Sequence, residues 1–425
     1  MPLICTGKDN TNALLKAWKK LARSLLLGAA LVLSCLPTDL QASGEDQILR
    51  LIGPQDAFIL AGPDNSLLLH KNADKKLIPA STLKLVSALA VMDVLGRDYR
   101  FETHIYAAPD NAVTIKGFGD PLLISEIVTD MVAAVRRAAR QRNLQIQGLY
   151  VDDTYFKKPI VIPGTTPSLQ PYDAPVGAFC VNFNTVNYRI VNGSIRSAET
   201  QTPLLPYAEN LIRRNGSGKG DRIVLSHDND TIALYGAHLV AYFLIDGKDT
   251  TNENLGLRSV NPVTDSRLLV YRSPLVLTDL VHRMMSFSNN FIANQLVIAA
   301  GAARYGAPGT LEKAARLLNT YGRQTLGLTD MTIVEGSGIS RQNRLTARSL
   351  LQVLAEFEPY HTLLRNQGAE YFKTGTLSGV SSRVGYLQRP DGGRYRFVIV
   401  MNSPGGSAVR IKRALGDYLR ENRYP

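Results

Sequence analysis

A serine and a lysine stand three residues apart at the start of an apolar segment, in Ser81-Thr82-Leu83-Lys84. On a helix this spacing places both side chains on one face, so the amine can reach the hydroxyl. A serine is a weak nucleophile until a base takes its proton, and a desolvated lysine can act as that base because burial favours the neutral amine. The ordinary alternative is a helix-capping serine beside a solvated lysine, which explains poorly a lysine on an otherwise apolar segment. The segment therefore favours nucleophilic serine chemistry.

Two further motifs follow in chain order. Ser288-Asn289-Asn290 lies between two segments of helical periodicity, where polar residues alone would indicate caps and turns. Lys373-Thr374-Gly375-Thr376 ends a strand-like run; its glycine leaves room for another backbone, and its lysine and hydroxyls can hold a carboxylate. A competing S-x-N, at 259–261, lies in a segment without periodicity and is predicted to be a loop. The order S-x-x-K, S-x-N, K-T-G is typical of penicillin-interacting serine enzymes.

The elements that must position these motifs are mostly helices and antiparallel strands. Residues 80–95 are apolar nearly all round and stop at Gly96, which predicts a buried helix in the centre of a core. Residues 57–61 and 67–70 predict a hairpin around Pro63-Asp64-Asn65-Ser66. Further helices are predicted at 275–285, 291–305, 311–321, 347–357 and 410–420, and further strands at 371–375, 383–388 and 395–401.

A chain of 425 residues exceeds what one ordinary core supports, so two domains or a large insertion are expected. From about 101 to 256 the texture changes to short strand-like runs and Pro/Gly/Asn-rich stretches, with one amphipathic helix around 124–142. We therefore predict an α/β fold. A catalytic domain, an antiparallel sheet flanked by helices, comprises 43–103 plus 257–425, and a strand-rich inserted domain comprises 104–256.

Composition excludes several other classes of protein. Apolar residues make up 45% and charged residues 20%, so the chain is globular rather than disordered. The three cysteines form no CxxC and no Cys/His cluster, so we expect neither a disulfide framework nor a structural zinc site. The net charge of +12 would suit an anionic partner such as a wall polymer, but no nucleic-acid-binding motif accompanies it, and we expect no nucleic acid.

The first 42 residues have the layout of a secretory signal peptide. A basic segment at 16–23 precedes an apolar run at 25–36, which is too short to span a bilayer comfortably, and Leu40-Gln41-Ala42 offers a small-residue exit. Val32-Leu33-Ser34-Cys35 also looks like a lipoprotein cleavage box; an incidental cysteine is the favoured interpretation, and lipidation of Cys35 stays open. We expect a protein of the periplasm or another extracytoplasmic compartment that touches the membrane only peripherally or through that lipid.

More of the chain than the three motifs resembles a known family, the class C (type 4) low-molecular-mass penicillin-binding proteins, which are D-alanyl-D-alanine carboxypeptidases and endopeptidases. The resemblance runs from about residue 56 to the C-terminus and thins between 196 and 258, where the family's large insertion looks shortened. It also accounts for the separation of 204 positions from Lys84 to Ser288. The segments that carry it are Gly119-Asp120-Pro121, Val151-Asp152-Asp153-Thr154-Tyr155-Phe156, Asn182-Phe183-Asn184, Glu335-Gly336-Ser337-Gly338-Ile339-Ser340-Arg341 and Lys373-Thr374-Gly375-Thr376-Leu377-Ser378-Gly379-Val380.

The resemblance implies a role for each motif residue. Ser81 would attack a D-Ala carbonyl to give an acyl-enzyme, and Lys84 would accept its proton. Ser288 would relay a proton to the leaving amine, and Asn290 would hold Lys84 and the substrate amide. The terminal carboxylate would be bound by the K-T-G-T segment, Lys373, Thr374, Gly375 and Thr376. The backbone N–H groups of Ser81 and Thr376 would form an oxyanion hole. The resemblance also implies that no metal or organic cofactor is required.

Three residues outside the motifs are predicted to border the substrate. Arg341 follows a glycine-rich loop and could clamp a carboxylate of the peptide side chain; a surface salt bridge is the equal alternative. Asp152 and Phe156 are placed in the same region from the inserted domain. The expected partners are peptidoglycan stem peptides, with β-lactams as covalent inhibitors.

Two rival functions remain at this level. A serine β-lactamase shares the three motifs, but its E-x-x-L-N segment has no counterpart between Ser288 and Lys373. A non-catalytic wall-binding protein of the same fold is the alternative from another class. The sequence leaves open the balance between carboxypeptidase and endopeptidase activity, the diamino acid of the stem and the oligomeric state.

Overall fold

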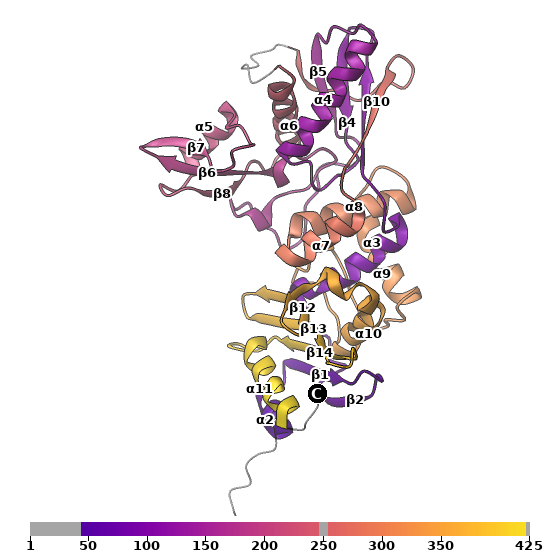
Figure 1. Ribbon diagram of the computed structural model, residues 1–425, viewed down its shortest axis with the longest axis vertical. Coiled ribbons are helices and arrows are strands. Elements are labelled where there is room, and N and C mark those ends of the chain that lie inside the picture. The colour runs from indigo at the N-terminus through magenta and orange to yellow at the C-terminus, as the bar shows by residue number, and fades with distance from the viewer. Residues whose placement is uncertain (1–43, 246–253, 422–425) are drawn as a thin grey trace, which may run out of the picture. The chain divides into compact units, whose positions relative to one another are not determined.

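The computed structural model describes residues 44–245 and 254–421 (Figure 1). The predicted signal peptide, with Cys35 and its proposed lipid, lies outside these residues. The described chain begins with α2 (Gly44–Leu51). None of its helices is long and apolar enough to cross a membrane.

A six-stranded antiparallel sheet joins the two ends of the chain's sequence. Its order is β11-β12-β13-β14-β1-β2, so N-terminal strands pair with C-terminal ones. Alternate side chains of β1 point to opposite faces: Ala57 and Ile59 join the core around the central helix, and Phe58 and Leu60 join the core under the C-terminal helix. The predicted hairpin and late strands are confirmed as β1 (Asp56–Ala61), β2 (Leu67–Lys71), β12 (Glu370–Leu377), β13 (Val380–Gln388) and β14 (Arg394–Met401). The short edge strand β11 (Arg365–Gln367) was not predicted.

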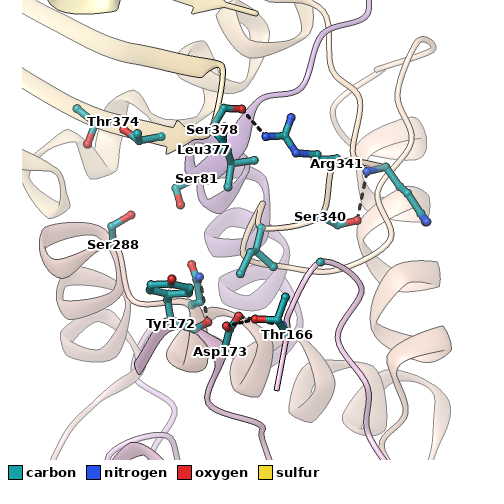
Figure 2. A pocket seen from close by; sticks show the side chains of 15 residues that line it. Ser81, Thr166, Tyr172, Asp173, Ser288, Ser340, Arg341, Thr374, Leu377 and Ser378 are labelled. Carbon is teal, nitrogen blue, oxygen red and sulfur yellow. Dashed lines mark hydrogen bonds between the residues drawn. The ribbon is translucent and has the colours of Figure 1, made fainter. Parts of the chain in front are cut away.

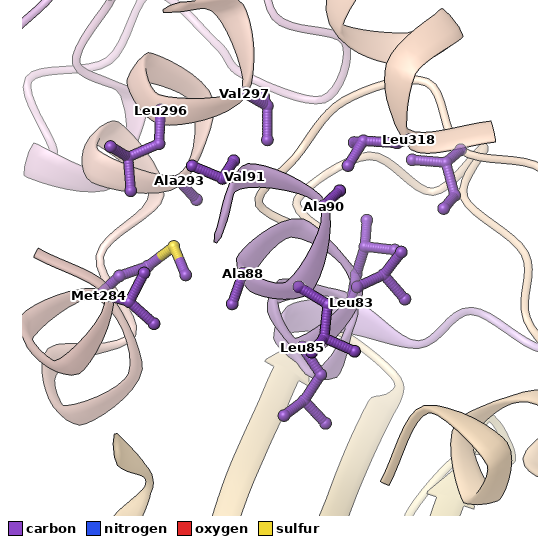
Figure 3. Packing of buried hydrophobic residues seen from close by; sticks show 14 of the residues in the cluster. Leu83, Leu85, Ala88, Ala90, Val91, Met284, Ala293, Leu296, Val297 and Leu318 are labelled. Atoms are coloured by element: carbon purple, nitrogen blue, oxygen red, sulfur yellow. The ribbon is translucent and has the colours of Figure 1, made fainter. Parts of the chain in front are cut away.

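A buried helix, α3 (Lys84–Leu95), is surrounded by other helices (Figure 3). The predicted helix over 80–95 is confirmed, except that its first residues form a tighter 3₁₀ turn, η1 (Ala80–Leu83). It ends at Gly96, whose φ of 86° a glycine adopts without strain. The helices that surround α3 match the predicted periodicity and are α7 (Leu277–Phe287), α8 (Asn290–Tyr305), α9 (Leu311–Gln324) and α10 (Ala347–Phe357). The short turn η4 (Glu358–Leu363) follows α10. The last predicted helix is confirmed as α11 (Ala408–Glu421), which lies on the other side of the sheet.

The middle of the chain forms a second, five-stranded mixed sheet of order β10-β3-β4-β5-β9. Strands β4 and β5 run parallel, and α4 (Ser125–Gln141) connects them, because parallel neighbours need a crossover. The apolar face of α4 packs into the core of this region, which confirms the predicted amphipathic helix. The strands are β3 (Glu102–Ala107), β4 (Ala112–Lys116), β5 (Gly148–Asp152), β9 (Leu255–Leu257) and β10 (Ser266–Arg272).

Two more helices lie in this middle region than the sequence predicted. One is α5 (Pro206–Asn215) and the other is α6 (Asn229–Leu244), which is apolar nearly all round and capped by the Asp228 side chain. A three-stranded sheet of order β7-β6-β8 completes this middle region. Its strands are β6 (Thr185–Val191), β7 (Ser194–Ser197) and β8 (Asp221–Val224), and the short turns η2 (Pro171–Asp173) and η3 (Asn182–Asn184) precede it.

The sheets suggest where the inserted region begins and ends. Strands β3 and β10 both belong to the five-stranded sheet and pair with each other. The chain therefore enters this sheet at 102 and leaves it at 272. We propose that the inserted region spans about 102–272, somewhat wider than the predicted 104–256.

The core around α3 allows a direct test of packing. Leu318 of α9 is fully buried in it, whereas Leu67 of β2 is 41% exposed. Leu318→Ala should lower the free energy of unfolding by about 2–5 kcal/mol, because it removes buried methyl groups and leaves a cavity. Leu67→Ala, the matched control, should change it by roughly 0.5 kcal/mol or less. Urea titration followed by circular dichroism measures both, and equal losses would contradict this assignment of the core.

Candidate active site

Ser81 sits in a turn whose backbone is strained and tightly packed. Ala80, just before it, has a φ of +48°, in the left-handed region that residues with a side chain rarely adopt. A Cβ on Gly338 would lie 2.0 Å from Ala80 O, and one on Gly375 would lie 2.8 Å from Ser81 N. The K-T-G glycine therefore makes room for the chain's own backbone at Ser81, where the sequence had suggested room for a substrate.

The Lys84 amine is buried among three oxygen atoms from three parts of the chain. Lys84 Nζ lies 2.9 Å from Ser81 Oγ, 2.8 Å from Asn290 Oδ1 and 2.7 Å from Ser337 O. Burial, and then the nearby charge of Lys373, hold the pKa of Lys84 well below its ordinary value, and the Glu335 carboxylate opposes them in part. The neutral amine is thus favoured at this position.

The same three contacts orient that neutral amine. It keeps two N–H donors and one lone pair. The Asn290 amide oxygen and the Ser337 carbonyl can only accept, so both N–H groups are engaged by them. The lone pair is left facing Ser81 Oγ, which can donate its proton. The arrangement is that of a serine beside its base.

The three residues of the S-x-N segment have different tasks. Asn289 is the N-cap of α8, and its side chain accepts from Ile292 N. Ser288 is the last residue before it, with a left-handed φ of 53°, and both Ser288 and Asn290 line the cavity described below. Capping therefore explains Asn289, and only the outer two residues are free for chemistry.

Lys373, on β12, is the second buried amine of the site. Its Nζ donates to Ser288 Oγ at 2.7 Å and to Thr374 O at 2.7 Å. Burial lowers the pKa of Lys373 to about 7. Ser288 therefore connects the K-T-G strand to the break between α7 and α8.

A cavity of about 770 Å³ opens over these groups, a size typical of ligand sites (Figure 2). Ser81 lines it from η1, Ser288 from the break between α7 and α8, and Thr374 from β12. Tyr172 and Asp173 line it from η2. Thr376 also lines it. Six of the predicted site residues thus surround one space: Ser81, Ser288, Asn290, Arg341, Thr374 and Thr376; Lys84 and Lys373 reach it through their hydrogen bonds.

Arg341 lies at the rim of this cavity and is exposed. Its guanidinium donates to the backbone carbonyl of Ser378, just after the K-T-G strand. Figure 2 shows it across the cavity from Ser288 and Tyr172. The predicted alternative, a surface salt bridge, finds no carboxylate partner among the ion pairs of the described chain.

Asp152 and Phe156 lie outside the residues that line the cavity. Asp152 is buried in the five-stranded sheet, where it pairs with Lys116 at 2.9 Å and accepts from Val260 N. Its Val260 contact holds the 259–261 segment as the predicted loop. Phe156 is buried against Gly119 and Gly309. Both side chains thus have structural contacts, and their predicted contact with substrate stays a prediction.

Several cavity residues were missed from the sequence. Tyr172 is 56% exposed, and buried Asp173 beside it accepts hydrogen bonds from Thr166 and Ser168. The only signal was a Tyr-Asp pair inside a proline-rich stretch, which also fits any loop. No group of three or more His, Cys, Asp or Glu side chains in residues 44–245 and 254–421 is placed to hold a metal ion.

Comparison with known proteins identifies the family. The sequence profile of the D-Ala-D-Ala carboxypeptidase 3 (S13) family matches residues 49–366, most of the chain. The chain belongs to this family. It is similar to the D-alanyl-D-alanine carboxypeptidase of Actinomadura sp. (strain R39), with 28% identity over 432 residues covering 83% of this chain and 79% of that protein.

Solved structures show that this S13 family member shares a fold with penicillin-binding protein 4 (dacB) of Haemophilus influenzae. That structure gives a TM-score of 0.69 at 18% identity and covers 88% of this chain and 98% of its own. A second structure of the same protein, complexed with a novel β-lactam, gives 0.63 at the same identity and coverage. The S13 member therefore has a penicillin-binding transpeptidase-like domain with an inserted domain, and it is a serine D-Ala-D-Ala carboxypeptidase.

The low pKa of Lys373 predicts how activity of this S13 peptidase depends on pH. Because the pKa is lowered to about 7, the ammonium loses its proton as pH rises through 7, and the attraction that Lys373 is predicted to exert on a substrate carboxylate is lost with it. The pH profile of kcat/KM for a D-Ala-D-Ala peptide should fall on the alkaline side near pH 7, since kcat/KM reports the free enzyme.

The alkaline fall should be weaker in kcat, because a bound carboxylate stabilises the ammonium. Lys373→Ala should remove it and raise KM. A flat kcat/KM up to pH 9 in the wild-type protein would contradict the assignment.

Proposed function

We propose that the protein cleaves the terminal D-Ala from peptidoglycan stem peptides through an acyl-enzyme on Ser81. The observation that carries the proposal is the 2.9 Å contact between Ser81 Oγ and a buried amine whose two other partners can only accept. Ser81 Oγ attacks the carbonyl of the penultimate D-Ala, and its proton moves to Lys84 Nζ.

The second half of the reaction uses the neighbouring hydroxyl. Collapse of the tetrahedral intermediate breaks the peptide C–N bond, and Lys84 returns the proton to the leaving amine through Ser288. Free D-Ala departs, and the acyl group stays as an ester on Ser81. Water then attacks the ester, which releases the shortened peptide and restores the hydroxyl. No metal or organic cofactor takes part.

Substrate binding is assigned to the strand and the turn beside Ser81. Lys373, Thr374 and Thr376 hold the terminal carboxylate, which lies over the end of β12. The backbone N–H groups of Ser81 and Thr376 stabilise the oxyanion. Because Gly375 lets β12 approach Ser81 N closely, these two N–H groups can lie on the same side of the cavity, which supports their joint role. Asn290 orients both the Lys84 amine and the substrate amide.

The wider cavity supports a second activity on the same site. It extends from Ser81 to Arg341, Tyr172 and Asp173, further than a D-Ala-D-Ala dipeptide requires. We propose that it also accepts the longer leaving group of a D,D cross-link, so that the protein acts as an endopeptidase. Assays on a cross-linked muropeptide dimer and on its monomer, with the products separated by chromatography, test the two activities side by side.

Export and inhibition follow from the same substrate. Stem peptides lie outside the cytoplasm, so we propose that residues 1–42 direct export and that the protein works in the periplasm or an equivalent compartment. A β-lactam offers a strained amide to the same serine, and a structural relative was solved with one. We propose that β-lactams acylate Ser81 and are released slowly, unlike in a β-lactamase.

Labelled penicillin tests the nucleophile directly. The mature wild-type protein should gain one adduct of stable mass, mapped to the peptide that contains Ser81. Ser81→Ala should give no adduct and background D-Ala release, because Ser81 Oγ is the hydroxyl that contacts Lys84 Nζ in the described part of the chain. Ser286→Ala, which removes a nearby hydroxyl on α7, should label normally. A folded wild-type protein that stays unlabelled would support the non-catalytic wall-binding alternative, and rapid loss of the adduct would support a β-lactamase.

The position of Arg341 predicts selectivity for the peptide side chain. Arg341→Ala should lower kcat/KM by roughly 10- to 100-fold for stem peptides whose diamino acid carries a free carboxylate, the range for a charged hydrogen bond. The Arg341→Ala variant should cleave peptides whose diamino acid lacks that carboxylate at nearly the wild-type rate. Arg348→Ala, a surface arginine paired with Asp74, serves as the control. An equal loss on both peptides would exclude Arg341 as the clamp.

A further inference from the structure

Glu335 is a fully buried carboxylate that the chemistry above does not use. Its oxygens accept six hydrogen bonds, all from neutral groups in the described chain: Oε1 from Gly338 N, Ser340 N and Asn343 Nδ2, and Oε2 from Asn294 Nδ2, Ser337 N and Ser337 Oγ. Five of the six distances lie between 2.7 and 3.1 Å. Neutral donors stabilise a buried charge without cancelling it.

The turn that Glu335 organises touches the catalytic helix at three points. Ser337 O accepts from Lys84 Nζ at 2.7 Å, and Gly336 O accepts from Ser87 Oγ at 2.6 Å, three residues further along α3. Gly338 packs so closely on the backbone before Ser81 that a Cβ there would lie 2.0 Å from Ala80 O. A small shift of the turn would therefore move an acceptor of the base and press on the nucleophile's backbone.

The carboxylate is also a charge near the base. Burial and the Lys373 charge lower the pKa of Lys84, and Glu335 is the group that raises it. Without such a counter-charge the amine would more readily be neutral, but it would hold the proton taken from Ser81 less well. Glu335 thus acts on both the place and the proton affinity of Lys84.

We propose that Glu335 is a positioning residue for this reaction: its carboxylate holds the 335–340 turn so that Ser337 O fixes the Lys84 amine against Ser81, and the same carboxylate presents a negative charge to that amine. The inference rests on the proposed roles of Ser81 and Lys84. It adds a residue that touches neither substrate nor the reacting atoms.

Glu335→Gln tests the proposal with nearly unchanged shape. One oxygen becomes an NH₂ group that faces three donors, so the turn should loosen and the rate constant of acylation by penicillin should fall roughly 10- to 100-fold, short of losing the base itself. Loss of the negative charge should also lower the pKa of Lys84, so the acid limb of acylation against pH should move to lower pH. Each acylation rate is divided by the fraction of protein molecules that carry the penicillin label at the end of the reaction.

Glu335→Asp separates charge from reach. It keeps the negative charge but is one methylene shorter, so acylation should slow while the acid limb stays at its wild-type position. If Glu335→Gln fails to fold, Asn343→Ala replaces it: this variant removes one donor to Oε1 and leaves the charge, and it should slow acylation without moving the limb downward.

Asp56→Asn is the matched control for losing a buried carboxylate. Asp56 is 2% exposed and accepts from Gly53 N, Asn402 N and Ser403 N, and Lys84 is not among its partners. It should lower the melting temperature but keep the acylation rate per labelled site and its pH profile.

The outcomes separate this inference from the function beneath it. Slower acylation with a lowered acid limb in Glu335→Gln, and an unchanged profile in Asp56→Asn, support it. A folded Glu335→Gln protein with the wild-type rate and pH profile overturns it, whatever the change in stability. Failure of the wild-type protein to label at Ser81 would instead overturn the proposed function.

Discussion

The site depends on keeping the Lys84 amine out of water. An isolated ammonium in a protein interior is costly, so the position lowers the pKa of the lysine and demands acceptors for its N–H groups. Two acceptors come from the start of α8 and from the 335–340 turn, and the third partner, Ser81 Oγ, comes from η1. Three segments far apart in sequence must therefore meet at one nitrogen, and the packing of α3 among its neighbouring helices makes this possible.

The second buried amine of the site, Lys373, differs from Lys84 in its contacts. Lys373 also has a lowered pKa, and its charge disfavours a charge on Lys84. The Lys84 amine is thus shifted toward the neutral form and faces a hydroxyl, whereas Lys373 lies on β12, the strand predicted to bind a carboxylate. Ser288 contacts the second amine from the break between α7 and α8, where its left-handed backbone turns it toward the cavity. Strand, helix break and helix start are interdependent.

The inserted region completes the cavity rather than lying apart from it. Tyr172 and Asp173 reach the cavity from η2, and Asn290 Nδ2 donates to Tyr172 O at 3.4 Å. Changes in the 163–173 loop can therefore alter which peptide fits without touching Ser81 or Lys84. The lining of the cavity thus has two origins: Arg341 comes from the segment that follows Glu335, and Tyr172 comes from the inserted region.

The sequence alone determined the helices with strong periodicity, the late strands, the order of the three motifs and the family resemblance. These features are local, because an apolar face or a short motif depends only on residues that are close together in the sequence. Only the tertiary structure decided which loops meet. It brought Tyr172 and Asp173 to the cavity, buried Asp152 and Phe156 outside it, and placed Gly375 against the backbone of Ser81. Glu335 shows the physical reason. A glutamate whose carboxylate is buried and accepts hydrogen bonds from backbone N–H groups cannot be told from a surface glutamate in the sequence, because only long-range packing distinguishes the two.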